Sequence, residues 1–194
     1  MLSELLEELR LIVSGKWNDY GRYPLAQAID GNSEHYEREA LCYLIEQMGL
    51  RTVFEIGTYN GLTAQVMGMM PEIESVWTLD LPAGSDPVLP VSANPDDRRW
   101  MGVAVVDMLP DSVTLLHGDS ATFDFRPWHG RCDLVYVMGA HSDEYIDNDL
   151  AVARQLRTGS GVVVLNCGSF WPMHRAGNRH RIHKINERMG IVEY

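Results

Sequence analysis

Cysteine, long apolar runs and positive charge are all scarce in this chain of 194 residues. Its three cysteines, Cys42, Cys132 and Cys167, lie far apart with no CxxC pair, which indicates reduced intracellular thiols and argues against a disulfide framework. No apolar run approaches the roughly 18–20 residues of a membrane-spanning helix. Acidic residues precede the apolar ones at the N-terminus, unlike in a secretory signal. We therefore expect a cytoplasmic protein with no membrane partner.

Lysine and arginine number 16 against 27 aspartates and glutamates, which gives a formal net charge of -11. A surface of that sign repels phosphate backbones, so we expect no nucleic-acid partner. The one basic stretch, HRAGNRHRIHK at 174–184, fits either a solvated helix face or a site for an anion or substrate. The first strand is not followed by G-x-G-x-x-G, which disfavours a nicotinamide-dependent oxidoreductase.

Apolar periodicity predicts strands that alternate with helices along most of the chain. We expect helices over 2–13, 33–48, 60–70, 96–109, 145–157 and 177–189, and strands over 51–58, 75–81, 113–119, 132–139 and 161–167. Asn60 and Asn94 are expected helix caps, and Gly49 is an expected helix stop. The final IVEY is expected to start one more strand.

This alternation implies right-handed crossovers and a mainly parallel sheet. The strands are continuous apolar runs, as in sheets that are covered on both faces. We therefore predict an α/β fold, a doubly wound, Rossmann-like, mainly parallel sheet with helices on both faces. Residues 1–49 are predicted to form an N-terminal helical cap or lid on the single structural unit 50–194.

The first predicted strand ends in FEIGTYNGLT, where a carboxylate stands beside two glycines. Gly57 and Gly61 tolerate positive φ and let a ligand approach the backbone, and Glu55, inside the loop mouth, could receive a cationic ligand. A tight turn with a solvated glutamate is an equal alternative from the glycines alone. Ligands of doubly wound folds bind at such strand ends.

The next two strand ends also carry acids. Asp80 ends the second strand, where a carboxylate can accept both hydroxyls of a ribose. Asp119 and Ser120 follow the third strand, so an acid can accept from an exocyclic amine and a backbone N–H can donate to a ring nitrogen. His117 is interpreted as a half-buried strand residue and not as a catalyst. Together the three strand ends describe a pocket for a nucleoside.

That order of strand ends resembles the class I S-adenosylmethionine-dependent methyltransferases. LDLP, GDSATFDF, DLVYVMGAHSDEY and IDNDL are similar to the small-molecule branch of catechol and caffeoyl type, and the resemblance covers roughly residues 50–168. It implies a transferase that binds S-adenosyl-L-methionine, or its product S-adenosyl-L-homocysteine, through Glu55, Gly57, Thr58, Tyr59, Asn60, Gly61, Asp80, Leu81, Asp119, Ser120, Met138 and Gly139.

The sequence departs from that branch where its metal-dependent members hold a divalent cation. Met138 stands in place of an aspartate, and the next strand ends in Asn166 and Cys167 where the branch typically has WHDY. Mg²⁺ prefers hard oxygen ligands, so a thioether, an amide and a thiol suit it poorly. We expect no metal. Met138 would either fill a gap or form a soft wall beside the methyl-donor sulfur.

His141 is the predicted general base, because it follows the fourth strand and its reference pKa suits neutral pH. A loop histidine that hydrogen-bonds the backbone is an equal alternative. Asp143 and His174 are weaker candidates. Aromatic residues that could cover the site and line a substrate pocket are Trp17, Tyr20, Tyr23 and Trp171.

The leading hypothesis is a metal-independent methyltransferase that acts on oxygen or nitrogen of a small molecule. The alternative is a non-catalytic protein that binds S-adenosylmethionine or S-adenosylhomocysteine. Members of the family usually end in an antiparallel hairpin, of which IVEY would supply at most the first strand. An exposed sheet edge favours pairing, so a homodimer is expected.

Overall fold

We describe a computed structural model in which residues 2–19, 22–23, 34–82, 84–91 and 108–194 are placed. Seven strands form one sheet in the order β3-β2-β1-β4-β5-β7-β6. The strands are β1 Thr52–Ile56, β2 Ser75–Asp80, β3 Val113–His117, β4 Cys132–Val137, β5 Arg157–Asn166, β6 Ile182–Lys184 and β7 Met189–Val192. The helices are α1 Leu2–Val13, α3 Glu34–Met48, α4 Leu62–Gly68, α5 Asp143–Leu156 and α6 Phe170–Arg179, with a 3₁₀ turn at Arg126–Trp128.

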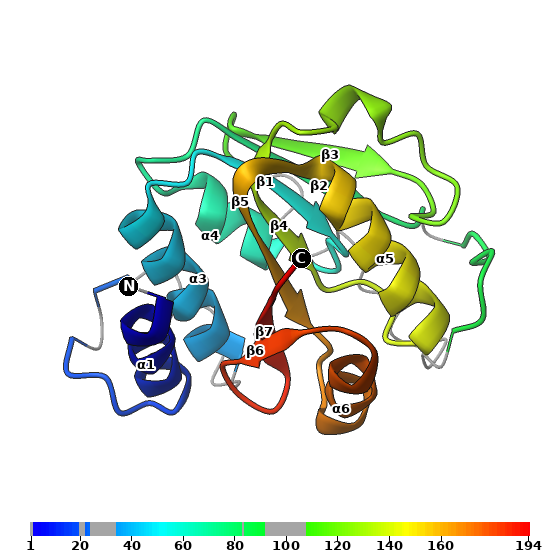
Figure 1. Ribbon diagram of the computed structural model, residues 1–194. Coiled ribbons are helices and arrows are strands. Elements are labelled where there is room, and N and C mark those ends of the chain that lie inside the picture. The colour runs from blue at the N-terminus through cyan, green and yellow to red at the C-terminus, as the bar shows by residue number, and fades with distance from the viewer. Residues whose placement is uncertain (1, 20–21, 24–33, 83, 92–107) are drawn as a thin grey trace.

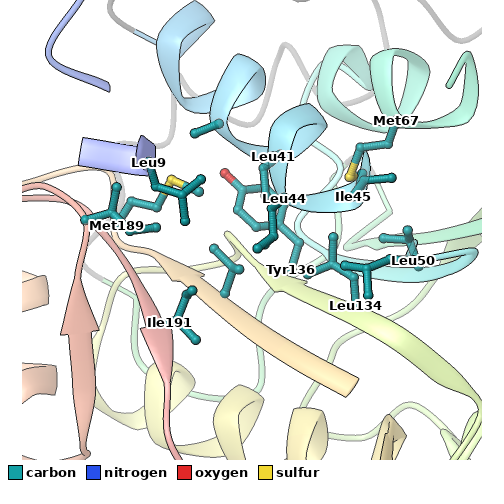
Figure 2. Packing of buried hydrophobic residues seen from close by; sticks show 14 of the residues in the cluster. Leu9, Leu41, Leu44, Ile45, Leu50, Met67, Leu134, Tyr136, Met189 and Ile191 are labelled. Atoms are coloured by element: carbon teal, nitrogen blue, oxygen red, sulfur yellow. The ribbon is translucent and has the colours of Figure 1, made fainter. Parts of the chain in front are cut away.

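The sheet is parallel from β3 to β5 and is covered by helices on both faces (Figure 1). On one face α1 and α3 bury leucines and isoleucines, and α4 buries Ala64 and Met67, against β1, β4 and β7. Figure 2 shows this core, in which Leu41 and Leu44 of α3 lie close to Tyr136 of β4. On the other face α5 and α6 pack against the same strands. The predicted doubly wound, Rossmann-like fold is therefore confirmed.

Local signals explain where several helices begin and end. The Ser142 side chain accepts the Tyr145 N–H at 3.3 Å, and Asp143 and Glu144 lie in the first turn of α5, where negative charge stabilises the helix. Gly49 has a φ of 61° after α3, as predicted for a helix stop. The cap of α4 is Gly61 and not Asn60, although Asn60 Oδ1 accepts the Leu62 N–H at 3.1 Å.

The C-terminal region differs from the prediction. The helix expected over 177–189 is wrong, because α6 ends at Arg179 and the chain then forms the antiparallel pair β6–β7. β7 also pairs antiparallel with β5, so IVEY completes the hairpin and does not start it. Pro172 in the first turn after Ser169 was the overlooked signal for the start of α6.

The completed hairpin changes the argument for a dimer. It covers the edge of β5 and leaves β3 and β6 as the outer strands of the sheet. The expectation of a hairpin that lacks its second strand is therefore wrong, and the homodimer stays a prediction. The helix expected over 96–109 lies almost entirely outside the described residues, as does its cap Asn94. No helix in the described part of the chain is long and apolar enough to cross a membrane.

Candidate functional site

The carboxyl ends of the neighbouring strands β2, β1, β4 and β5 meet at one edge of the sheet. The loop after β1 packs directly on the end of β4, since a Cβ added to Gly57 would lie 2.3 Å from the Met138 carbonyl oxygen. Three residues of that loop have positive φ, at 104° for Gly57, 49° for Tyr59 and 75° for Gly61. The predicted glycine-rich turn exists, and a tight backbone contact requires its first glycine.

Glu55 lies deeper than the open loop mouth in which it was expected. Its carboxyl is 1% exposed and accepts the Thr78 hydroxyl at 2.5 Å, and Thr78 lies 2.6 Å from the Thr58 hydroxyl. Burial raises the pKa of Glu55 to about 8; the Thr78 hydrogen bond opposes this rise and the charge of Asp80 adds to it. The side chain therefore holds a proton at neutral pH. Thr78, which faces Glu55 across the β1–β2 ladder, was not predicted.

Asp80 ends β2 and is fixed by backbone donors. Its Oδ2 accepts the Tyr59 N–H at 2.6 Å and its Oδ1 accepts the Leu81 N–H at 2.8 Å. Burial raises the pKa of Asp80, although these hydrogen bonds counteract the rise. The left-handed Tyr59 backbone is thus held against the carboxylate. His117 pairs with Asp80 in the β2–β3 register and is exposed, not half-buried as expected.

Asp119 joins three segments beyond the end of β3. Its Oδ2 accepts the Tyr145 hydroxyl and the Val88 N–H, both at 2.7 Å, and its Oδ1 accepts the Ala121 N–H at 2.8 Å. Burial acts to raise the pKa of Asp119, but the three donors outweigh it and hold the pKa below its usual value. The Leu89 N–H also donates to the Tyr145 hydroxyl oxygen at 3.3 Å. Segment 84–91 is therefore fastened beside the predicted adenine contact.

Asp149 on α5, the second aspartate of IDNDL, contacts the residues around Asp119 and was not predicted as a site residue. It is 1% exposed, and burial raises its pKa to about 6 against hydrogen bonds from Ser120 and Asn148. Asn148 Nδ2 donates to the Asp149 carboxylate at 3.0 Å and to the Ser120 carbonyl at 3.2 Å. A Cβ on Gly139 would lie 3.1 Å from Asp149 Oδ2. Asp149 thus ties Ser120 and Gly139 to α5.

The imidazole of His141 lies against the turn after β5. A Cβ on Gly168, which has a φ of 63°, would be 2.6 Å from the ring Cε1. Burial lowers the pKa of His141, so the ring is neutral at neutral pH. Its buried Nε2 has no hydrogen-bond partner among the residues that the structure describes. A neutral, unpartnered imidazole nitrogen has the properties of a general base.

The two weaker base candidates are engaged elsewhere. Asp143 accepts Arg175 Nε at 2.8 Å and also pairs with Arg179 at 3.4 Å. His174 lies among the rings of Phe170 and Trp171, with centroid distances of 5.6 and 6.1 Å. Neither arrangement leaves a group as well suited to take a proton as His141.

The basic stretch at 174–184 is a paired helix surface in its first half. Arg175 and Arg179 of α6 contact Asp143, and Arg179 and His180 contact Asp147 of α5 at 3.0 and 2.8 Å. These acids neutralise much of the positive charge. The alternative of a solvated helix face is therefore favoured over an anion site.

The three residues at the lost metal positions make other contacts. The Met138 sulfur accepts the Tyr136 hydroxyl at 3.1 Å, and Asn166 Nδ2 donates to Glu37 at 2.8 Å. Cys167 is fully buried, and burial raises the pKa of its thiol to about 12. Within the described ranges, no group of three or more His, Cys, Asp and Glu side chains could hold a metal ion. Metal independence remains a prediction.

The described aromatic residues that were predicted to line one substrate pocket lie in two different parts of the structure. Trp17 and Tyr23 stack at 6.3 Å, and the Trp17 indole donates to Glu8 of α1 at 2.9 Å, so both belong to the N-terminal packing. Trp171 is 66% exposed at the start of α6. Tyr20 lies outside the described residues. Among the three that the structure describes, Trp171 is the one that remains a candidate for contact with substrate.

No protein-family model matches the chain, and no curated protein is similar to it in sequence. Its structure is similar to the SAH-bound Podospora anserina methyltransferase PaMTH1, over 98% of this chain and 88% of that one, with a TM-score of 0.57 and 16% identity. It is also similar to the methyltransferase domain of bacterial CtHen1-CN, over 81% of this chain and 97% of that one, with a TM-score of 0.51 and 13% identity.

A further neighbour is a Staphylococcus aureus structure assigned as a caffeoyl-CoA O-methyltransferase, with a TM-score of 0.49, 13% identity and coverage of 66% of this chain. The chain spans only about half of that protein, 55% of its length. Identities this low indicate a shared fold and leave the chemistry to the site residues. The chain has the Rossmann-like fold that solved methyltransferases also have.

Proposed function

We propose that the protein transfers a methyl group from S-adenosylmethionine to an oxygen or nitrogen atom of a small molecule, without a metal ion. The observation that carries this proposal is the arrangement at one sheet edge. Asp80 ends β2, Asp119 follows the adjacent β3, and His141, whose Nε2 has no hydrogen-bond partner among the described residues, follows β4. Doubly wound sheets bind their ligands at this edge.

The two aspartates fit a nucleoside. Each oxygen of Asp80 accepts one backbone N–H, which leaves further lone pairs for the two hydroxyls of a ribose. Asp119 stays ionised, and its Oδ1 can accept from an exocyclic amine in addition to the Ala121 N–H. The other residues of the proposed cofactor site lie in the loops after β1, β2, β3 and β4: Gly57, Thr58, Tyr59, Asn60, Gly61, Leu81, Ser120, Met138 and Gly139.

Glu55 supplies this site with one carboxyl group that can hold or release a proton. The carboxyl is protonated when no ligand is present, because burial raises its pKa to about 8. A cationic group that binds nearby lowers the pKa of a carboxyl, so an ammonium ligand would be met by an ionised Glu55. The hydroxyls of Thr78 and Thr58 form the hydrogen-bonded path from this carboxyl to the β1 loop.

S-adenosylmethionine supplies, when bound, a methyl group activated by a positively charged sulfur. A bond forms between the acceptor atom and the methyl carbon, the sulfur–carbon bond breaks, and its electron pair stays on sulfur. His141 takes the proton of the acceptor, because its ring is neutral and its Nε2 is unpartnered within the described part of the chain. Alignment of the acceptor contributes much of the remaining rate.

A non-catalytic binding protein is the second candidate. It is favoured by the absence of a carboxylate at Met138. Such a protein would bind the cofactor or its product and methylate no acceptor.

Two measurements test the proposal. Calorimetry should detect binding of S-adenosylmethionine and S-adenosylhomocysteine, and a labelled methyl donor should yield product in a screen of small phenols, sugars and amines. His141→Ala should then lower turnover by roughly a hundredfold or more, the scale of general-base catalysis, with cofactor affinity nearly unchanged. Arg126→Ala, on an exposed turn, is the control and should keep full turnover. Cofactor binding without any methylated acceptor would favour the binding protein, and no cofactor binding would refute both.

A further inference from the structure

A buried amide at the end of β5 connects three elements around the proposed site. Asn166 is 2% exposed. Its Nδ2 donates to the Glu37 carboxylate at 2.8 Å and to the Tyr136 hydroxyl oxygen at 3.1 Å, while its Oδ1 accepts the Gly168 N–H at 2.9 Å. One side chain thereby links α3, β4 and the turn that follows β5. An amide can do this because it carries donors and an acceptor at once.

The first branch of this network leads to Met138. Tyr136 is 1% exposed and lies beneath α3 in the core shown in Figure 2. Its hydroxyl accepts from Asn166 and donates its own proton to the Met138 sulfur at 3.1 Å. Met138 is therefore oriented by a polar contact and does more than fill a gap between apolar side chains.

The second branch leads to His141. Asn166 holds the backbone N–H of Gly168, and the His141 ring lies directly on that glycine. The φ of 63° and the 2.6 Å separation between an added Cβ and the ring Cε1 leave no room for another residue. The position of the imidazole thus depends on the turn that Asn166 fixes.

The network is anchored at its far end by charge. Glu37 is 4% exposed, and its Oε1 contacts Arg188 at 2.8 Å and Asn186 at 3.1 Å. Both partners belong to the turn between β6 and β7. A buried carboxylate is costly when one of its partners is lost, so this end is strongly held in one arrangement.

We propose that Asn166 is a positioning residue that holds the Met138 thioether and the His141 imidazole in place at the methyl-transfer site. This inference rests on the proposed function. Asn166 does not itself react. Loss of its amide should misplace both side chains and leave unaffected the cofactor-binding acids Asp80, at the end of β2, and Asp119, after β3.

Variants can separate the two branches. Tyr136→Phe removes the hydrogen bond to Met138 and the one from Asn166, but leaves Asn166 bonded to Glu37 and Gly168. Gly168→Ala disturbs only the seat of His141, and Asn166→Ala affects both branches. Tyr194→Phe is the matched control, because it removes one hydroxyl that donates to the Leu150 carbonyl at 2.6 Å and, within the part of the chain that the structure describes, makes no contact with the network. NMR of the Met138 methyl group and of the His141 ring reports each position without any need for turnover.

We expect Asn166→Ala to shift both signals and to lower kcat roughly 10- to 100-fold, the scale of misalignment, with the cofactor Kd within about twofold. Tyr136→Phe should shift only the methionine signal and Gly168→Ala only the histidine signal. If Asn166→Ala does not fold, the Tyr136→Phe and Gly168→Ala variants test the positioning role by themselves. Unshifted signals overturn the positioning role even if the enzyme is active. Shifted signals with no turnover in any form support the network and count against the proposed function.

Discussion

Among single residues, the buried carboxyl of Glu55 has the clearest consequence for pH. Its folded pKa of about 8 lies above the ordinary value of 4.5, so the folded state keeps a proton that the unfolded state has lost. Stability should therefore fall as pH rises from about 4.5 to 8, by up to about 1.4 kcal/mol per pH unit from this group.

Glu55→Gln tests this prediction, because the amide cannot ionise. Urea unfolding at pH 5, 7 and 9 should show a variant that gains stability relative to the wild type as pH increases. Glu74→Gln, on the exposed surface beside Arg51, is the control and should follow the wild type. Parallel stability curves for Glu55→Gln and the wild type would show that Glu55 is ionised in the folded protein.

Asp80 is the residue on which cofactor affinity should depend most. Asp80→Ala removes a carboxylate that is placed for two ribose hydroxyls, and we expect a loss of about 1.5–3 kcal/mol in binding free energy. Calorimetry with S-adenosylhomocysteine measures the change. Asp124→Ala, an exposed acid paired with Arg126, should bind normally. Equal affinities for both variants would contradict the ribose assignment.

At the level of secondary structure, α5 organises the cofactor side of the site. Its first turn presents Tyr145 to Asp119, and its second turn carries Asp149 beneath Gly139. In the loop after β2, the Val88 N–H donates to Asp119 and the Leu89 N–H donates to the Tyr145 hydroxyl oxygen. One helix therefore fixes segments that follow β2, β3 and β4.

Tyr145→Phe should loosen this fastening. The lost hydroxyl donates to a charged acceptor, a contact worth about 1.5–3 kcal/mol, so hydrogen exchange at the Val88 and Leu89 amides should accelerate roughly tenfold or more. Exchange at Leu79 in β2, which is buried in the sheet, should not change and serves as the internal control. Unchanged exchange at Val88 would mean that the loop is held by other contacts.

At the scale of the whole molecule, side-chain contacts engage the residues that stand where metal-dependent members of the resembled branch hold a cation. The polar network from Glu37 to Met138 occupies the side chains at the ends of β4 and β5, and helices on both faces of the sheet hold those strands rigidly. The proposed reaction at this edge relies on alignment of the acceptor and on a protein base.

Methyl transfer should accordingly survive chelation. We expect the rate in EDTA to match the untreated rate within about twofold and Mg²⁺ to give no increase, because a thioether and engaged amide do not attract a hard cation. The comparison uses the same acceptor in both conditions. Loss of turnover in EDTA with recovery on Mg²⁺ addition would contradict metal independence.

The sequence by itself determined which strand ends carry the acidic residues of the proposed site. Apolar runs followed by acids predicted the parallel sheet and placed Asp80 and Asp119 at the carboxyl ends of neighbouring strands, because parallel strands align these ends. His141 was recognisable for the same reason, from its place just after a strand.

Only the tertiary structure decided how these side chains are held. The depth of Glu55 depends on Thr78 across the β1–β2 ladder, and the seat of His141 depends on Gly168 after a different strand. The β6–β7 hairpin formed where a helix was predicted, because the edge of β5 offers backbone partners that helical periodicity does not record. Contacts between distant residues, such as Glu37 with Asn166 at a separation of 129 positions, leave no periodic pattern in a sequence.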